Sequence, residues 1–431
     1  MEIVLHLHLM LSLLFGSINI MIKRCKHIIL IAIALMTLES CVEPFETGTE
    51  NFEDILVVEA TITNEFKYQE INLSRTYRLE DDKKPYEINA QVAVVDDAQN
   101  TYHFQEIDSG TYRSTIKFAV LPARKYELAI TTSNGKKYGS TPKELTSTSA
   151  AFQLSVIKET NALGIEGISI YANSFDPTNT SKYYRYTYEE TYKIIAPYWS
   201  PLDAFGVSYL PTVPNPPPYH EVYTLPRTQE ERVCYGTVNS NTILQTDTNL
   251  LAEDRVDKFL VLFLPKDAFK ITHRYSVVVN QLVESPEVYS YYKTLDKFSG
   301  SENVFSQKQQ GFIPGNLYVV DDPDKKVLGY FEVSSATSER IFFNFEDYFP
   351  NQDKPSYITE CNILAPDLDD LSQFGSPDFS PLIKLLFFDN FKFVDFNDPK
   401  NNPNNPYFIV RRECGDCTAL GANIKPAFWV D

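Results

Sequence analysis

The sequence is poor in histidine and lacks the short motifs of several enzyme classes. It has six histidines in 431 residues. His220-Glu221 begins like the zinc-protease motif His-Glu-x-x-His, but the second histidine does not follow. Gly-x-Ser-x-Gly, Gly-x-Gly-x-x-Gly and the phosphate-binding P-loop pattern are absent too. We therefore expect neither a zincin site nor a site of those nucleophilic or nucleotide-binding classes, and we assign no catalytic residue, metal ligand or cofactor.

Long apolar runs are confined to the first 40 residues. A basic cluster of Lys23, Arg24 and Lys26 precedes the apolar segment 28–38, and the small residue Ser40 stands before Cys41. This is the order of parts in a secretory signal peptide, and the apolar segment is too short to cross a bilayer as a helix. Residues 1–40 are therefore predicted to be a signal peptide, with translation starting at Met21. The alternative is a transmembrane helix in residues 1–22, which would bury two histidines in lipid.

The end of this leader predicts a lipid anchor. Leu38-Glu39-Ser40-Cys41 resembles the bacterial lipobox, in which the cysteine thiol is acylated and the peptide bond before it is cut. Glu39 departs from the usual residue at its position. Several acyl chains on one residue give lasting attachment to a membrane. We predict lipidation at Cys41, and an ordinary signal peptide cut near this cysteine is the alternative.

Basic residues are outnumbered by acidic ones, 39 to 57, and the formal net charge is −18. A surface with this much negative charge repels phosphate backbones. We therefore do not expect nucleic acid as a partner. Residues 42–54 carry five acids and no base, which predicts that residues 41–54 form a solvated acidic tether. Asp367, Asp369 and Asp370 form a second acidic run. It lacks the complete ligand pattern of a calcium loop, so we interpret it as a solvated loop instead.

Glycine and methionine are scarce, with 16 and 4 residues, whereas the chain has 29 phenylalanines, 27 tyrosines and 26 prolines. This composition favours strands over helices. From Ile55 onward, short alternating segments recur at about ten-residue spacing, which predicts an Ig-like β-sandwich over residues 55–145. A larger β-rich domain is predicted over residues 150–431. The fold class is therefore mainly β.

One clear helix is predicted in the larger domain. Ser285 is a suitable N-cap, Pro286 suits the first helical position, and apolar residues then recur at helical spacing up to Gly300. "VLGYFEVSS" and "ERIFFNF" are predicted to pair as a hairpin, and "LIKLLFF" is predicted to be a strand. In "SKYYRYTYEETYKII", alternate tyrosines share one face. That stripe predicts half-buried sheet residues, with a sugar-binding platform as the alternative.

Residues 197–226 are predicted to form a long, stiff loop. They hold eight prolines, and proline at this density disfavours a sheet interior. Long loops in compact domains are often functional, and stiff exposed aromatic residues bind at low entropic cost. The residues predicted to contact a ligand or partner are Trp199, Phe205, Tyr209 and Tyr219.

Four cysteines remain after Cys25 leaves with the leader and Cys41 takes lipid. They are Cys234, Cys361, Cys414 and Cys417. In an exported chain, two structural disulfides are the simplest prediction, and the sequence leaves all three pairings open. Cys414-Gly-Asp-Cys417 also has the spacing of redox and zinc sites, but no βαβ pattern surrounds it.

The order of several segments resembles domain-of-unknown-function family 4249, a family of Bacteroidota outer-membrane lipoproteins. These segments are "LVVEATITN", "INLSRTY", "YYRYTYEETY", "HRYSVVVNQLVESPEVYSYYKTL", "IPGNL", "VLGYFEVSS" and "CGDCTALGANIKPAFW". The likeness extends over nearly all of residues 41–431. Its most specific part is the closing Cys-x-x-Cys-Thr with Pro426 and Trp429.

This resemblance implies an outer-membrane lipoprotein that acts as an external accessory of a TonB-dependent receptor and is not an enzyme. Acidic residues soon after the lipidated cysteine resemble a signal for export to the cell surface. Glu43 and Glu46 fit that signal, while Val42 and Pro44 depart from it. The resemblance names no ligand, and a small molecule, a glycan and a peptide all remain open.

Three functions follow from these observations. The leading hypothesis is a non-enzymatic binding protein that captures a ligand or caps a TonB-dependent transporter. The second is a surface glycan hydrolase with a carboxylate pair, which needs two carboxyl groups at suitable separation in a pocket. The third is a structural or adhesive envelope protein, for which no concave pocket is expected.

Overall fold

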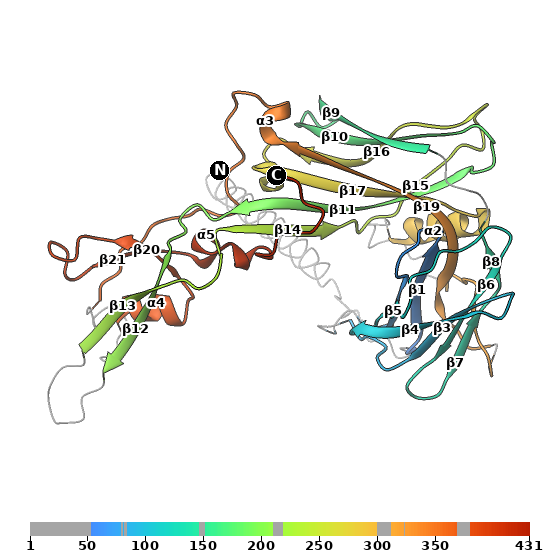
Figure 1. Ribbon diagram of the computed structural model, residues 1–431, viewed down its shortest axis with the longest axis horizontal. Helices are drawn as coiled ribbons and strands as arrows, with labels where there is room; N and C mark the ends of the chain where they lie inside the picture. Colours follow the sequence, from blue (N-terminus) through green and yellow to red (C-terminus); the bar gives the residue numbers. More distant parts are fainter. Residues whose placement is uncertain are drawn as a thin grey trace, which may run out of the picture. The chain divides into compact units, whose positions relative to one another are not determined.

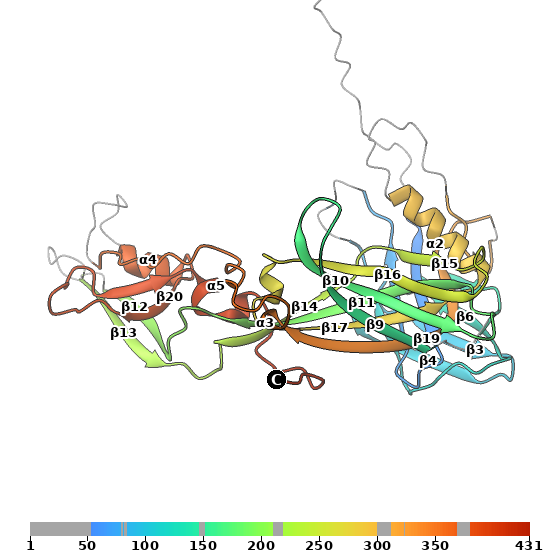
Figure 2. The same ribbon diagram turned by 90° about the horizontal axis from the view of Figure 1, so that it is seen from above.

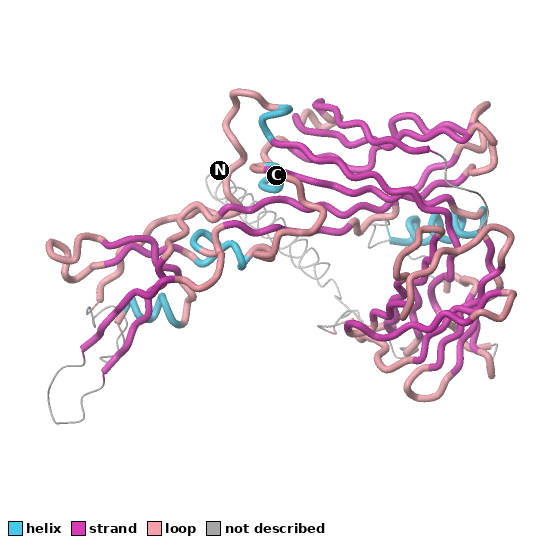
Figure 3. The backbone as a smooth tube through the Cα atoms, in the orientation of Figure 1, coloured by secondary structure: helices cyan, strands magenta, loops and turns pink. Residues whose placement is uncertain are grey.

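The computed structural model describes residues 53–78, 81, 84–145, 151–209, 219–299, 312–322, 324–368 and 380–431. The leader, Cys41, most of the acidic tether, Gly300 and two of the three aspartates in the acidic run lie outside these residues. Within them the protein is mainly β, as predicted (Figure 3). No helix of the described residues combines the length and the apolar character needed to cross a membrane.

Residues 55–145 form a β-sandwich-like unit around one apolar core. The alternating segments predicted over this range form six strands, and two further short strands follow them. They are β1 (Leu56–Thr63), β2 (Glu70–Arg75), β3 (Gln91–Asp96), β4 (Thr101–Asp108), β5 (Thr111–Ser114), β6 (Lys125–Thr131), β7 (Lys137–Ser140) and β8 (Lys143–Glu144). Alternate residues of β6 are buried and exposed, as expected for a sheet with one face on a core.

Two strands from far along the chain complete this unit. β18 (Leu317–Val319) pairs with β7, and the first half of β19 (Leu328–Asn344) runs parallel to β1. Val319 and Phe331 from these strands lie in the same core as β1 to β7. The sandwich therefore includes residues well beyond the segment 55–145.

The predicted hairpin of "VLGYFEVSS" and "ERIFFNF" is wrong, because both segments belong to the single strand β19. Its residues up to Ser334 pair with β1, and from Ser335 onward they pair with β17 (Arg274–Val283) (Figure 1). The linking residues contain neither glycine nor proline, so nothing in the chain forces a reversal there. β19 thus joins the sandwich to the sheet that follows.

Gly329 permits the close parallel pairing of β19 with β1. Its φ is +109°, a backbone conformation that side-chain-bearing residues rarely adopt. A Cβ atom at this position would lie 1.8 Å from the carbonyl oxygen of Val58, its register partner. Any other residue at 329 would therefore force the two strands apart.

The second half of the fold is a two-layer arrangement. One layer holds β14 (Val233–Asn239), β11 (Tyr183–Ile195), β17 and the end of β19, and β15 (Leu244–Asp247) also pairs with β11. The other layer holds β9 (Ala151–Thr160), β10 (Glu166–Asp176) and β16 (Asp254–Pro265) (Figure 2). A short 3-10 turn (Phe269–Ile271) leads into β17. Apolar residues from both layers form one core.

The tyrosine stripe on β11 belongs to this core. Tyr184 and Tyr186 are fully buried, and Tyr188 and Tyr192 pack against the same cluster while partly buried. The Tyr186 ring stacks on Phe259 of β16 at 4.9 Å between centroids. The prediction of buried sheet tyrosines is confirmed for this face.

The predicted helix is α2 (Pro286–Ser299). The Val288 amide donates to Ser285 Oγ at 3.3 Å, which confirms Ser285 as the cap. The described residues also form three shorter helices, namely α3 (Phe345–Tyr348), α4 (Pro381–Phe387) and α5 (Arg412–Gly415). The strand predicted for "LIKLLFF" is wrong, because it forms α4. Ser380 caps that helix and Pro381 fits its first turn, two signals that outweigh the apolar run.

A buried charge network lies where β19 passes from one sheet to the next. Arg185 of β11 forms ion pairs with Glu284, just after β17, and with Glu332 of β19. Both carboxylate side chains are fully buried. Gln245 donates to Glu284 at 2.6 Å, and the Tyr292 ring of α2 lies 4.2 Å from the guanidinium carbon. One cation therefore balances two buried carboxyl groups.

Because one cation faces two buried carboxyl groups, the free energy of unfolding depends on pH. Burial raises the pKa of Glu284 to about 7, and the neighbouring Glu332 adds to the rise while Arg185 opposes it. A carboxyl whose pKa is raised by folding binds its proton more tightly in the folded state. Its protonation therefore stabilises the protein fully below the unfolded pKa, and this contribution is lost as pH rises through about 7.

We expect Glu284→Gln to remove this pH dependence, because glutamine stays neutral at every pH. Between pH 5 and pH 8 the wild type should lose roughly 2–3 kcal/mol of unfolding free energy relative to the variant. Urea unfolding at both pH values measures the difference. Glu253→Gln, at an exposed ion pair with Arg255, is the control and should leave the pH profile of the wild type unchanged. The same change in unfolding free energy between pH 5 and pH 8 for the wild type and Glu284→Gln would contradict the prediction.

Candidate binding surface

The segment predicted as a proline-rich loop contains a β-hairpin. β12 (Leu202–Tyr209) pairs antiparallel with β13 (Tyr219–Pro226), separately from the larger sheets. The prediction of a loop throughout residues 197–226 is wrong. Its prolines are compatible with strands because Pro201 precedes β12, Pro226 ends β13 and the others, apart from Pro197, fall between the strands.

One face of the hairpin packs on α4. Ala204 and His220 are buried, and a Cβ atom at Gly206 would lie 2.6 Å from the Ile383 side chain. Glycine at 206 therefore lets the strand approach the helix closely. The hairpin is also held by β21 (Tyr407–Val410), whose Tyr407 hydroxyl donates to the Val222 carbonyl at 2.9 Å.

The opposite face exposes apolar side chains. Phe205 and Tyr223 are register partners across the strands, 38% and 49% exposed, and their rings stack at 5.9 Å between centroids. Leu225, two residues beyond Tyr223, is 49% exposed. We call Phe205, Tyr223 and Leu225 the aromatic face of the hairpin. Because aromatic rings carry much of the binding energy in protein interfaces, this face is suited to a partner.

The four predicted contact residues fall in different places. Phe205 lies on the aromatic face. Tyr209 and Tyr219 are register partners at the end of the hairpin that adjoins the connecting residues 210–218, and their side chains lie outside the described part. Trp199 precedes β12 and packs with Cys234 and Cys417, and its buried indole nitrogen has no hydrogen-bond partner among the described residues. The structure therefore gives Trp199 a packing environment at the root of the hairpin.

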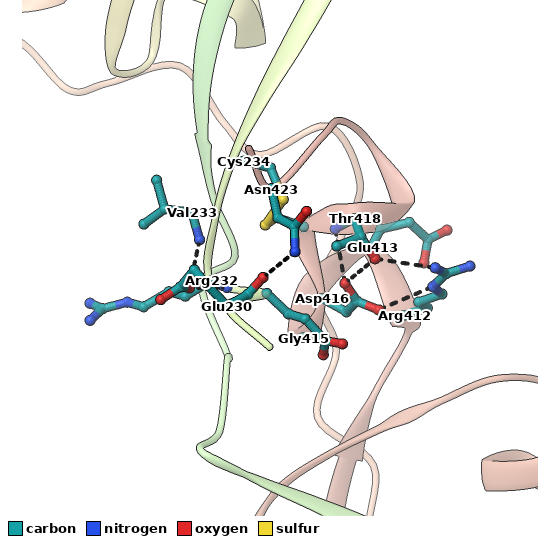
Figure 4. Close-up of a disulfide and its surroundings, with 12 residues drawn as sticks. Glu230, Arg232, Val233, Cys234, Arg412, Glu413, Gly415, Asp416, Thr418 and Asn423 are labelled. Carbon is teal, nitrogen blue, oxygen red and sulfur yellow. Dashed lines mark hydrogen bonds and ion pairs between the residues drawn. A yellow bond between two sulfur atoms is a disulfide. The ribbon is translucent and has the colours of Figure 1, made fainter. Parts of the chain in front are cut away.

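Two disulfides fix that root. Cys234 of β14 is bonded to Cys417, which lies in a 3-10 turn (Cys417–Ala419) (Figure 4). Cys361 is bonded to Cys414 of α5. Two disulfides were predicted, and the structure selects this pairing from the three open ones. The Cys-x-x-Cys pair thus makes two separate connections, which agrees with a structural role.

Polar contacts reinforce the disulfides. Asp416, between the two cysteines of the motif, accepts hydrogen bonds from the Thr418 amide at 2.8 Å and from Arg412 at 3.2 Å (Figure 4). Burial alone would raise the pKa of Asp416, but these hydrogen bonds lower it below its ordinary value. Arg227, at the end of the hairpin, donates to the Gly415 carbonyl at 3.2 Å. The hairpin is therefore anchored to the carboxyl-terminal segment.

Two adjoining cavities lie beside the Cys361–Cys414 disulfide. The first has a volume of about 450 Å³ and the second about 600 Å³. They share Phe391, just before β20 (Lys392–Phe396), and Arg411. The first is also lined by Thr359, Glu360, Asn362 and Leu364, and the second by Asp389, Arg412, Glu413 and Ala419. In the described residues, no group of three or more His, Cys, Asp or Glu side chains could hold a metal ion.

Sequence reasoning missed several of these residues. Tyr223 and Leu225 could have been found from strand alternation, had "YHEVYTLP" been interpreted as a strand. Phe391 and Arg411 carry no comparable signal, because they are brought together by a disulfide between distant segments. Their shared position becomes visible only in three dimensions.

Comparison with known proteins places the chain in a family. Residues 42–340 match the profile of the domain of unknown function DUF4249. The chain belongs to the DUF4249 family. The predicted family is thereby confirmed over residues 42–340. No curated protein matches the chain significantly. The DUF4249 match includes the hairpin and Cys234, whereas Cys361, Phe391, Arg411, Cys414 and Cys417 follow it.

Proposed function

We propose that this protein is a non-enzymatic outer-membrane lipoprotein that binds a TonB-dependent transporter through the aromatic face of the β12–β13 hairpin. The single observation that carries the proposal is the exposed, stacked pair of Phe205 and Tyr223. Apolar side chains grouped on one exposed face gain free energy when a partner covers them, and such patches mark interaction sites. The lipobox at Cys41 supports membrane attachment, and the family membership is compatible with it.

The contacts that hold the hairpin in place also support a binding role. α4 and Tyr407 cover one side, and the disulfide-linked segment holds its root. A rigid support lowers the entropy lost on association. The cavities of about 450 and 600 Å³ further favour a binding protein over a purely structural envelope component, for which no pocket is expected.

Photo-crosslinking in intact cells tests the proposal. With p-benzoylphenylalanine in place of Tyr223, we expect a crosslink to an outer-membrane barrel identified by mass spectrometry as a TonB-dependent transporter. The same probe at Leu250, which is 97% exposed in the turn before β16, is the matched control and should give no such product. Equal crosslinking at both positions, or crosslinks at 223 without any transporter, would refute the proposed partner.

A second measurement gives the size of the effect. Tyr223→Ser combined with Phe205→Ser should reduce co-purification of the transporter by about 30-fold, because loss of a central aromatic contact costs about 2 kcal/mol or more. Leu250→Ser should leave recovery unchanged. Undiminished recovery with the double variant would show that the aromatic face is not the interface.

A further inference from the structure

The two polar cavities beside the Cys361–Cys414 disulfide have the chemistry of a ligand site that is separate from the aromatic face. Small-ligand sites have volumes of about 300–1,000 Å³. The two measure about 450 and 600 Å³ and meet at Phe391 and Arg411. They therefore offer a continuous lining for a ligand with several repeating units.

The walls of this site are joined at three points. Cys361, between Glu360 and Asn362, is bonded to Cys414. Leu364 and Ile409 exchange two backbone hydrogen bonds of 2.9 Å, and the Tyr357 hydroxyl donates to the Glu413 carbonyl at 2.7 Å. The backbone of both walls is thus held in place before any ligand arrives, which reduces the entropic cost of binding.

Several polar side chains of the first cavity are available for hydrogen bonds. Within the described chain, Thr359, Glu360, Asn362 and Arg411 have no side-chain hydrogen bond or ion pair. Neighbouring charges are already engaged, since Arg412 contacts Asp416 at 3.2 Å and Asp389 contacts Lys384 at 3.4 Å. The available groups include a hydroxyl, a carboxylate, an amide and a guanidinium, so both donors and acceptors are offered.

The charged residues that line the two cavities indicate which class of ligand they can bind. Glu360 and Arg411 offset each other in the first cavity, and Glu413 adds a further carboxylate to the second. An anionic ligand would meet these carboxylates, whereas a ligand with neutral hydroxyl groups can both donate to them and accept from Arg411 and Asn362. Phe391 supplies an apolar surface against which the carbon face of a sugar ring can lie.

We propose that the paired cavities at Phe391 and Arg411 bind a neutral oligosaccharide. This inference goes beyond transporter docking, because it rests on residues outside the aromatic face. The disulfide has a positioning role, since it fixes Glu360 and Asn362 opposite Arg411.

Isothermal titration calorimetry of the full mature chain in detergent tests the proposal, with maltohexaose, cellohexaose, xylohexaose and mannohexaose as probes. We expect at least one to bind. Arg411→Ala and Asn362→Ala should each weaken its binding by about tenfold, because each removes hydrogen bonds to the sugar. Both positions are exposed, so the fold should be retained. Arg113→Ala, at a surface arginine of β5, is the control and should bind as the wild type does.

Three outcomes would overturn the proposal. These are no binding by any of the four neutral hexaoses, equal binding by the wild type and both variants, and preferential binding of hexagalacturonate or a hexapeptide. Each is independent of the crosslink at position 223. A negative result for sugar binding would therefore not contradict the proposed transporter docking. A negative crosslinking result would likewise not contradict the sugar site.

Discussion

Arg185→Met is expected to lower the free energy of unfolding by about 3–5 kcal/mol, because removing one partner of a buried ion pair leaves the other charges uncompensated. Here two carboxylates, Glu284 and Glu332, would lose their only cation in the network. Methionine keeps most of the side-chain volume, so the loss reports charge more than packing. Urea unfolding at pH 8, above the pKa of about 7 that Glu284 has in the wild type, measures it.

Two further variants separate charge from packing. Arg113→Met breaks an exposed ion pair with Glu70 and should cost at most about 1 kcal/mol. Glu284→Gln and Glu332→Gln added to Arg185→Met should recover much of the lost stability, because no buried charge then remains. If the triple variant is as unstable as Arg185→Met, the guanidinium acts through its packing against Tyr292 instead.

Loss of the Cys234–Cys417 disulfide should have the other large effect. The two cysteines are 183 residues apart in the chain, so the bond restricts a long loop of the unfolded state. The chain-entropy relation gives about 5 kcal/mol for this loop and about 4 kcal/mol for Cys361–Cys414, whose separation is 53. We expect Cys234→Ala with Cys417→Ala to destabilise the protein by roughly that amount, as measured by urea unfolding.

The matched comparison is Cys361→Ala with Cys414→Ala. It should be slightly less destabilising, because its loop is shorter. Peptide mapping without reduction should recover the 234–417 and 361–414 pairs. A bond between Cys414 and Cys417 would contradict the pairing and would restore the redox interpretation of the motif.

Local signals in the sequence predicted much of the fold. Alternation and turn residues placed the six strands of the sandwich, and the cap at Ser285 placed α2. Where two local signals pointed to different elements, the prediction relied on the weaker one. In "LIKLLFF" the apolar run suggested a strand, but Ser380 and Pro381 start a helix. The hairpin predicted around residue 335 failed for a different reason, because β19 changes neighbours without changing direction.

The candidate site was less predictable. Phe205 was predicted on a loop, and the structure places it on a hairpin instead. Trp199 packs partly buried against the cluster around Cys234 and Cys417, a position that its place near prolines in the sequence does not indicate. Arg411 and Phe391 depend on a pairing of distant cysteines that spacing alone leaves open.

The parallel contact between β1 and β19 has a consequence for how the chain folds. Thr61 and Glu332, which touch across this contact, are 271 residues apart. During synthesis, β1 cannot pair with β19 until most of the polypeptide has been made. Contacts of such high sequence separation form slowly, and an unpaired strand edge invites aggregation in the meantime. The amino-terminal unit is therefore among the last parts of the molecule to reach its final form.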